Sequence, residues 1–471
     1  MSFMSPITAA ISATVPAKRD LHPSKLLLAL AAFAVVAALR LPATWAEGRF
    51  QDEEATVFLA YAWHFPSEAL FRAFGGYLNI AANASTLLLS ELMKANIISL
   101  DRAPYFTMIA GLLSQLVPAI LILKSRSPWL ADVRHRAIAL SILVLMPTTE
   151  EVFLNVMHIQ FHLGLAVGLI MALQIGGSRR RALFEGSILV IAPLCGPAAI
   201  VFLPLFALRA LVERDRRRWR QFALLALGAA IQLLFFYHSS PLRGVPFDPV
   251  NLAAAMFIRL FALPFAGLSG ADRVGLIGAL GLVEGGPWLW MIAGVSVVFF
   301  GLLFAATIKV RDDAFWLFSA AISVAAVSLG FGIMGGQAYS AFFSLAGPRY
   351  NYIPLVLLGL CYLCLATRAD VAERRTPRVM IALMLFVGAV HFVNPTDIYA
   401  DGPSWKREVA AYRANPRYQL EVWPYFHVDL SDRHIRCDQP VANREDVPRY
   451  CEAGWLRSFD NWKNAKPLTS E

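Results

Sequence analysis

The stretch KLLLALAAFAVVAALRLPATWAEGRFQDEE, residues 25–54, decides the fold of this chain. It opens with an apolar run close to the roughly 20 residues needed to cross a bilayer. It closes with three consecutive carboxylates, Asp52, Glu53 and Glu54. Ionised side chains are costly in hydrocarbon, so these acids must lie in water or in a wetted cavity at the membrane edge. The stretch therefore predicts a retained first span, not a cleaved signal peptide, followed by an acidic loop.

The composition of the whole chain agrees with this reading. Of its 471 residues 57% are hydrophobic and only 16% are charged, and the mean hydropathy is +0.55. The apolar residues fall in many runs that are hydrophobic on all sides, whereas strand-like alternation is scarce. The sequence predicts an all-α polytopic membrane protein and argues against a soluble enzyme.

The formal net charge of +9 does not indicate a nucleic-acid partner. Most basic side chains stand in short clusters between apolar runs, as the positive-inside rule predicts for cytoplasmic loops. The positions of the basic clusters therefore indicate which loops are cytoplasmic. The clusters lie within 124–136, 179–181, 214–220, 309–311 and 368–378.

Placing each basic cluster inside predicts about eleven crossings. The chain then has a cytoplasmic N-terminal segment (1–25), a membrane domain (26–394) with a long first outer loop (about 47–103), and an extracytoplasmic tail (395–471). Residues 251–283 fit either a helix at the outer surface or a tight hairpin. The expected crossings are about 26–45, 104–124, 138–154, 159–176, a hairpin within 183–211 broken at 193–197, 221–238, 287–308, 314–334, 351–367 and 379–394.

This topology brings the unusual polar motifs to the outer face, which indicates a site there. No nucleotide-phosphate cradle, neither G-x-G-x-x-G after a strand nor a P-loop, occurs in the sequence. An activated sugar used at the outer face would therefore have to arrive on a lipid phosphate. The motifs are the acids at 52–54, Gly75 to Asn79, Glu150-Glu151, His158 and Gly347 to Tyr350.

Sugar transfer from a lipid phosphate to a hydroxyl needs a base and cationic help for the departing phosphate. Partial desolvation and like-charge neighbours raise the pKa of a carboxylate toward working pH, and the acids at 52–54 meet both conditions. The alternative is a solvated acidic helix start. Arg349-Tyr350, after a Gly-Pro turn, suits a lipid phosphate, although an ordinary interfacial anchor has the same residues.

Glu151, Asn155, His158 and His162 recur at helical spacing and predict one polar face if a helix continues through them. Such a face suits a metal or a phosphate, and it equally suits polar packing inside a bundle.

Taken in order, these residues resemble the GT-C glycosyltransferases, polytopic enzymes that use sugars linked to polyprenyl phosphate. The family patterns and their counterparts here are E-E-G-x-x-F at 53–58, G-Y-L at 76–78, E-V-F-x-N-x-x-N at 151–158 with His158 at the last position, G-P at 196–197, R-Y at 349–350 and G-P-S-W at 402–405. Ala55 stands where the family has Gly, and Asp52 adds a third carboxylate.

The resemblance implies an inverting transfer to a glycan or lipid acceptor, at the outer face of a bacterial inner membrane. One of the three acids would be the base, and Arg349, Tyr350 and His158 would meet the donor phosphate. Tyr77, Asn79 and Asn155 would contact substrate. Members of the family differ in whether they need a divalent cation; where magnesium or manganese is used, Glu150 and Glu151 would be the candidates to help hold it.

Two other functions remain open from the sequence. The broken hairpin at 193–197 suits a flippase for lipid-linked oligosaccharides or another transporter. A glycan polymerase or ligase shares the outer-face chemistry but takes sugars on polyprenyl pyrophosphate.

The cysteines and the tail tryptophans carry further expectations. Cys361 and Cys364 lie in an apolar run and predict small core side chains, whereas Cys437 and Cys451 could close a disulfide loop if the tail is extracytoplasmic. The tail tryptophans, including Trp405, either stack on sugars or form the core of a small cap.

Overall fold

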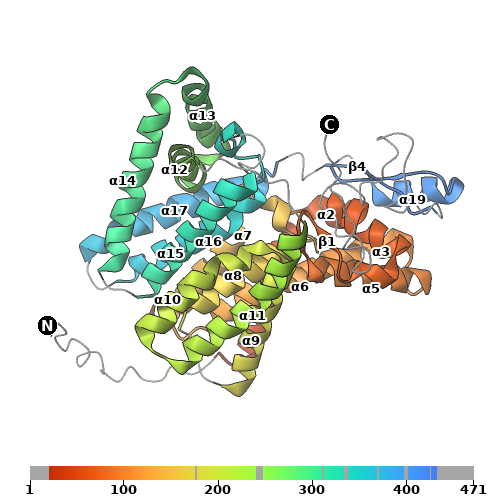
Figure 1. Ribbon diagram of the computed structural model, residues 1–471, viewed down its shortest axis with the longest axis horizontal. Helices are drawn as coiled ribbons and strands as arrows, with labels where there is room; N and C mark the ends of the chain where they lie inside the picture. Colours follow the sequence, from red (N-terminus) through yellow and green to blue (C-terminus); the bar gives the residue numbers. More distant parts are fainter. Residues whose placement is uncertain are drawn as a thin grey trace.

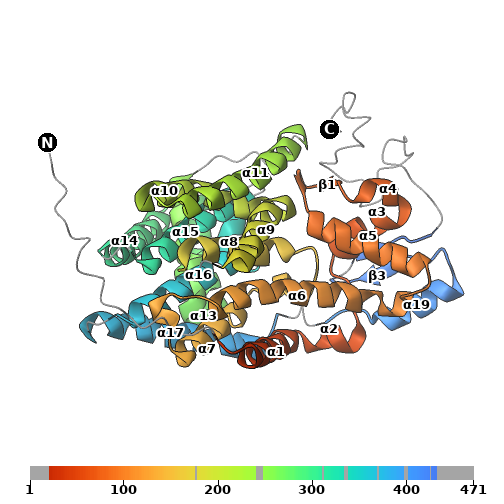
Figure 2. The same cartoon turned by 90° about the horizontal axis from the view of Figure 1, so that it is seen from below.

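The computed structural model describes residues 21–174, 178–239, 248–309, 312–333, 338–368, 371–396, 401–424 and 426–431. This part of the chain is almost entirely helical, with two short antiparallel strand pairs. A large helical bundle carries a smaller, separate group of elements at one end (Figure 1, Figure 2). The predicted all-α architecture is confirmed. Cys437 and Cys451 lie outside the described residues.

The bundle contains most of the chain. Its helices are α1 (Pro23–Leu39), α6 (Ala103–Leu123), α7 (Val133–Val144), α8 (Ile159–Ala172), α9 (Arg179–Cys195), α10 (Leu203–Glu213), α11 (Arg216–Ser239), α12 (Pro249–Phe257), α13 (Leu263–Glu284), α14 (Trp288–Ile308), α15 (Asp313–Val327), α16 (Arg349–Ala366) and α17 (Val371–Val393).

Seven helical segments of the described residues are long and apolar enough to cross a membrane. Two shorter apolar helices, α1 and α8, accompany them, and the count of eleven crossings stays a prediction. Helix α16 is the most buried span and packs against α7, α8, α15 and α17. The seven segments are Leu100–Leu123, Arg216–Tyr237, Pro249–Glu284, Trp288–Ile308, Asp313–Gly332, Arg349–Ala366 and Arg374–Val393.

The break predicted between 193 and 197 is present. Helix α9 ends at Cys195, and the 3₁₀ turn η5 (Pro197–Phe202) leads into α10. Gly196 is needed at the break, because a Cβ atom there would lie 1.9 Å from the side-chain oxygen of Gln160 on α8. Residues 249–284, by contrast, form one kinked helical stretch, in which α12, the π-helix η6 (Ile258–Ala262) and α13 follow one another and bend at Gly267.

The helix expected over 138–154 ends early, and this prediction is wrong. Helix α7 stops at Val144, and the chain continues as an irregular segment, here called the 145–158 loop, with one 3₁₀ turn at Glu150–Val152. The guanidinium of Arg40 donates hydrogen bonds to the carbonyls of Val144 and Met146. These carbonyls would otherwise accept the next helical bonds, and Pro147 cannot supply its own N–H.

The smaller group of elements joins the first loop to the tail. From the loop come α2 (Pro42–Glu47), the π-helix η1 (Glu54–Leu59), α3 (Ala60–His64), α4 (Pro66–Ala69), the pair β1 (Ala73–Phe74) and β2 (Tyr77–Leu78), and α5 (Ile80–Lys94). From the tail come α19 (Trp405–Ala414) and the pair β3 (Leu420–Val422) and β4 (Phe426–Val428). We call this unit the loop–tail subdomain.

The loop–tail subdomain has a hydrophobic core of its own. Trp405 and Trp423 are only 1% and 2% exposed, which makes them core residues of a cap and not platforms for a sugar. Cys361 and Cys364 are buried free thiols inside the bundle, as predicted. Core residues of the subdomain include Phe50, Ala55, Leu59, Leu89, Trp405, Val409, Leu420, Val422, Val428 and Leu430.

Candidate active site

The three acids lie where the loop–tail subdomain meets the bundle, at the start of η1. Their backbone is held by the tail: the N–H of Asp52 donates to the carbonyl of Trp423 at 2.5 Å, and the N–H of Trp423 donates to the carbonyl of Phe50 at 3.2 Å. The guanidinium of Arg49 lies 4.7 Å from the centre of the Trp423 ring. Asp52 has a positive φ of 34°, so the chain turns sharply at the acids.

Glu54 is buried, with only 1% of its surface exposed. Its two carboxylate oxygens accept from the N–H of Gln51 at 3.1 Å and from the N–H of Val156 at 2.9 Å. Burial raises the pKa of Glu54 from 4.5 to about 7, although both hydrogen bonds and the charge of Arg49 oppose this shift. Glu54 thus joins the acid segment to the 145–158 loop and does not face solvent.

Asp52 and Glu53 are the accessible acids of the three, since both are half-buried. The charge of Glu53 acts on His158 and on Arg349, which come from the 145–158 loop and from the start of α16. A half-buried carboxylate within electrostatic range of a guanidinium can accept a proton while an anion is bound at that guanidinium.

Glu151 and Arg349 form an ion pair that fixes the guanidinium. The Glu151 carboxylate also accepts from the backbone N–H of Arg349 at 3.1 Å. Burial raises the pKa of Glu151, but the charge of Arg349 and the hydrogen bonds that Arg349 donates outweigh burial and hold that pKa below its usual range. The Arg349 side chain stays 33% exposed while that of Glu151 is 7% exposed, so the guanidinium is the accessible partner.

His158 is neutral near pH 7. Burial lowers its pKa to about 4, against the opposing charges of Glu151 and Glu53. Nδ1 lies 2.7 Å from the carbonyl oxygen of Glu151, which can only accept, so this nitrogen carries the proton. Nε2 is left as an acceptor, 3.8 Å from the Glu151 carboxylate.

Asn155 and Asn79, both expected to contact substrate, are buried and used by the fold. Asn155 donates to the side-chain oxygen of Gln51 at 2.8 Å and accepts from the N–H of His158 at 2.9 Å. Asn79 caps α5 and donates to the carbonyl of Met157 at 2.9 Å. Both amides therefore hold the 145–158 loop in place.

Tyr77 and Tyr350 are half-buried at the edge of the site. The Tyr77 hydroxyl accepts from the amide of Gln160 at 3.3 Å. The guanidinium of Arg349 lies 5.2 Å from the Tyr350 ring, which keeps that charge close to an aromatic face. Both rings remain in reach of a ligand.

Glu150 and Glu151, the expected metal ligands, face different cations. Glu150 pairs with His391 and lies 3.8 Å from Arg40, whereas Glu151 pairs with Arg349. In the described part of the chain, no three His, Cys, Asp or Glu side chains stand together in a way that could hold a metal ion. Both carboxylates are therefore already engaged by side chains of the protein.

The polar stripe expected on one helix face is not helical, since Glu151 lies in a 3₁₀ turn and His158 precedes α8. Hydrogen bonds within the loop still bring Glu151, Asn155 and His158 together. The sequence analysis assigned no role to Arg40. Its position as an arginine near the end of an apolar run was the only signal.

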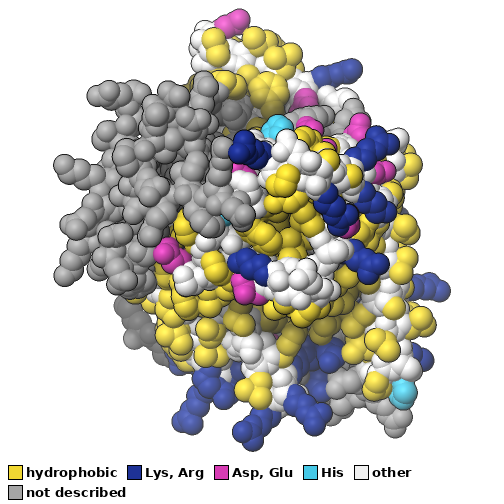
Figure 3. Space-filling view, turned by 90° about the vertical axis from the view of Figure 1, so that its right-hand side faces the viewer, with side chains coloured by type: hydrophobic (Ala, Val, Ile, Leu, Met, Phe, Trp, Pro, Cys, Tyr) yellow, Lys and Arg dark blue, Asp and Glu magenta, His cyan; other side chains and the backbone are white. Residues whose placement is uncertain are grey.

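Figure 3 views the end of the molecule that carries the loop–tail subdomain, where basic and acidic side chains gather among apolar ones.

Comparison with models of protein families, with curated proteins and with solved structures finds no match to this chain.

Proposed function

We propose that this protein is a GT-C-like glycosyltransferase that moves a sugar from a polyprenyl phosphate to a glycan or lipid acceptor at the outer face of a bacterial inner membrane. One observation carries the proposal. The half-exposed acid Glu53 lies within electrostatic reach of Arg349 and His158, residues of three separate segments that meet at one end of the bundle.

Glu53 is the proposed base. It takes the proton of the acceptor hydroxyl as that oxygen attacks the anomeric carbon of the sugar. The bond from this carbon to the phosphate oxygen breaks, and its electron pair leaves with polyprenyl phosphate. Because this is a single displacement, the configuration of the anomeric carbon is inverted. Asp52 ranks next because it is also half-buried, whereas Glu54 is enclosed by two backbone donors.

Arg349 is the proposed phosphate ligand. Two contacts from Glu151 fix its position, and its exposed third leaves donors to meet a phosphate at the headgroup level. Neutral His158 does not add positive charge, so the guanidinium supplies the stabilisation of the leaving phosphate.

The test uses the purified full-length protein in lipid with a panel of polyprenyl-phosphate sugars, an acceptor extract and a measurement of released polyprenyl phosphate. We expect Glu53→Gln to lower turnover by about 100-fold or more. Glu91→Gln, which changes an exposed acid on α5 of the same subdomain, is the matched control and should behave as wild type. Unchanged release in Glu53→Gln, Asp52→Asn and Glu54→Gln alike would contradict a carboxylate base in this segment.

A flippase is the second candidate, favoured by the break at Gly196 and the kink at Gly267 in two apolar helical stretches. The same preparation distinguishes it, because a flippase moves labelled lipid across the bilayer without releasing polyprenyl phosphate. Turnover only with pyrophosphate-linked donors would instead identify a polymerase or ligase.

A further inference from the structure

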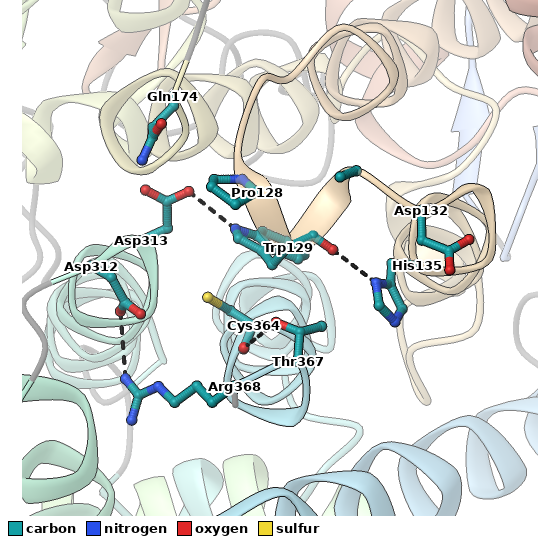
Figure 4. Close-up of a pocket in the computed structure, with 11 residues that line it drawn as sticks. Pro128, Trp129, Asp132, His135, Gln174, Asp312, Asp313, Cys364, Thr367 and Arg368 are labelled. Atoms are coloured by element: carbon teal, nitrogen blue, oxygen red, sulfur yellow. Dashed lines mark hydrogen bonds and ion pairs between the residues drawn. The ribbon is translucent and has the colours of Figure 1, made fainter. Parts of the chain in front are cut away.

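A pocket with polar side chains in its lining lies at the end of α16 opposite the candidate active site. That helix begins at Arg349 in the candidate active site, and the pocket adjoins its last residues, at the end where the sequence predicts the cytoplasm. The pocket has a volume of about 350 Å³, within the range of ligand sites. Figure 4 shows side chains from the turn after α6, from the segment after α8, and from the facing ends of α15 and α16 around it.

The wall of this pocket is fixed by internal hydrogen bonds. The buried carboxylate of Asp313 accepts from the hydroxyl of Ser127 and from the indole N–H of Trp129 at 3.1 Å. Nδ1 of His135 donates to the carbonyl of Trp129 at 3.0 Å (Figure 4). The Asp313 carboxylate therefore has hydrogen-bond donors within the protein. The same contacts hold the Trp129 ring in the wall of the pocket.

Arg368 is the lining residue whose donors are incompletely used. One terminal nitrogen donates to the carbonyl of Ala306 at 2.8 Å. Its Nε and the other terminal nitrogen are buried and have no hydrogen-bond acceptor. The carboxylate of Asp312 lies 3.5 Å from that terminal nitrogen, as an ion pair without a hydrogen bond. The Arg368 side chain lines the pocket and is 13% exposed, so a rotation of its guanidinium would bring these N–H groups to an oxyanion in the pocket.

The charges around the pocket restrict its ligand. Asp132, Asp312 and Asp313 line it together with one guanidinium, Arg368, so a polyanion such as a nucleotide would be repelled. Opposite charges only 3.5 Å apart match a short molecule whose oxyanion and ammonium are joined by a two-carbon linker. We propose that this pocket binds a small zwitterion, its oxyanion on Arg368 and its primary ammonium beside Asp312.

Such a zwitterion can be the headgroup of a membrane lipid or a free small molecule, and phosphoethanolamine represents both. The full-length protein is placed in nanodiscs of phosphatidylglycerol. One arm titrates soluble O-phosphoethanolamine by calorimetry, and the other introduces phosphatidylethanolamine into the nanodisc and follows the thermal midpoint. Binding in the first arm identifies a soluble ligand, and stabilisation in the second arm alone identifies a lipid headgroup.

We expect Arg368→Gln and Asp312→Asn each to weaken binding by about tenfold or more, which is the loss of one charge-assisted contact. Arg378→Gln, an exposed arginine of α17 outside the pocket, should bind as wild type does. Thr367→Phe fills the pocket without altering either charge and should also abolish binding, which covers the case in which Arg368→Gln does not fold. Absence of binding in both arms, or equal binding by wild type and Thr367→Phe, overturns the proposal.

Discussion

The backbone N–H of Asp52 donates a hydrogen bond to the carbonyl oxygen of Trp423 at 2.5 Å, so the tail of the chain is fastened directly to the acid segment. On its other side, the same segment is joined to the 145–158 loop through Glu54 and Val156. Three regions far apart in the sequence therefore determine where the candidate base lies. Each connection can be removed separately.

Removing the tail anchor should loosen the loop–tail subdomain. Trp405 is buried, packs edge-on against Phe50 at 5.0 Å and donates to the carbonyl of Leu100 at 2.8 Å. We expect Trp405→Ala to destabilise the subdomain by about 3–5 kcal/mol and to speed its cleavage by proteinase K. Lys406→Ala, at the exposed neighbouring position, should leave cleavage unchanged. Equal cleavage of both variants would show that the tail is not part of the subdomain's core.

Glu54 should make stability depend on pH. The folded protein keeps this carboxyl protonated up to about pH 7, while in the unfolded chain it ionises near 4.5. Between these values the folded state holds a proton that the unfolded state has released, so stability falls as the pH rises. The difference corresponds to about 3 kcal/mol of unfolding free energy.

Glu54→Gln cannot ionise and should lack this dependence. The thermal midpoints of wild type and variant, measured in detergent from pH 4.5 to 8, should therefore converge or cross as the pH rises. Glu91→Gln controls for the loss of an exposed acid. A constant difference between wild type and Glu54→Gln across this range would mean that Glu54 ionises at its ordinary pKa.

The pair between Glu151 and Arg349 should show strong coupling. Arg349→Ala leaves the buried Glu151 carboxylate without its main cation, and we expect a loss of about 2 kcal/mol of stability. Adding Glu151→Gln should recover much of that loss, which a double-mutant cycle on unfolding measures. Additive effects would show that the two side chains do not interact. Donor affinity is best tested with Arg349→Lys, which keeps the charge.

The packing of α6 against the 145–158 loop offers a steric test. A Cβ atom on Gly111 would lie 2.6 Å from the backbone nitrogen of Asn155, so Gly111→Ala must push the loop away. We expect a loss of about 1–3 kcal/mol and reduced sugar transfer, because Asn155 also holds Gln51. Gly301→Ala on α14 has no atom within 4 Å and should be neutral or stabilising by up to about 1 kcal/mol. Equal effects of the two changes would rule out close packing at Gly111.

The long spans were predictable from the sequence because their length and apolarity are local properties. The expected spans 104–124, 287–308 and 351–367 correspond to α6, α14 and α16 with end shifts of one or two residues. The early end of α7 was not predictable in this way. It depends on Arg40, a residue distant in sequence, whose guanidinium takes the carbonyls that a longer helix would use.

The candidate site was predictable as a set of residues but not as a set of roles. Topology alone placed the acids, Glu151, His158 and Arg349 on one face, and the structure brings them together. The sequence could not separate Glu53 from Glu54, because burial of Glu54 depends on the backbone of Val156. For the same reason Asn155 and Asn79 looked like substrate ligands although their amides serve the fold.

The shared core of the loop–tail subdomain imposes an order on biosynthesis. The ribosome makes Phe50 and its neighbours early, but Trp405 and strands β3 and β4 only after the last long apolar helix. Until the tail is made, the apolar face of the first loop is exposed. An exposed apolar face makes the chain prone to aggregation and to cleavage by quality-control proteases. Maturation of the acid segment is therefore a late event, and a nascent chain that stops short of the tail has every membrane helix but an unfinished site.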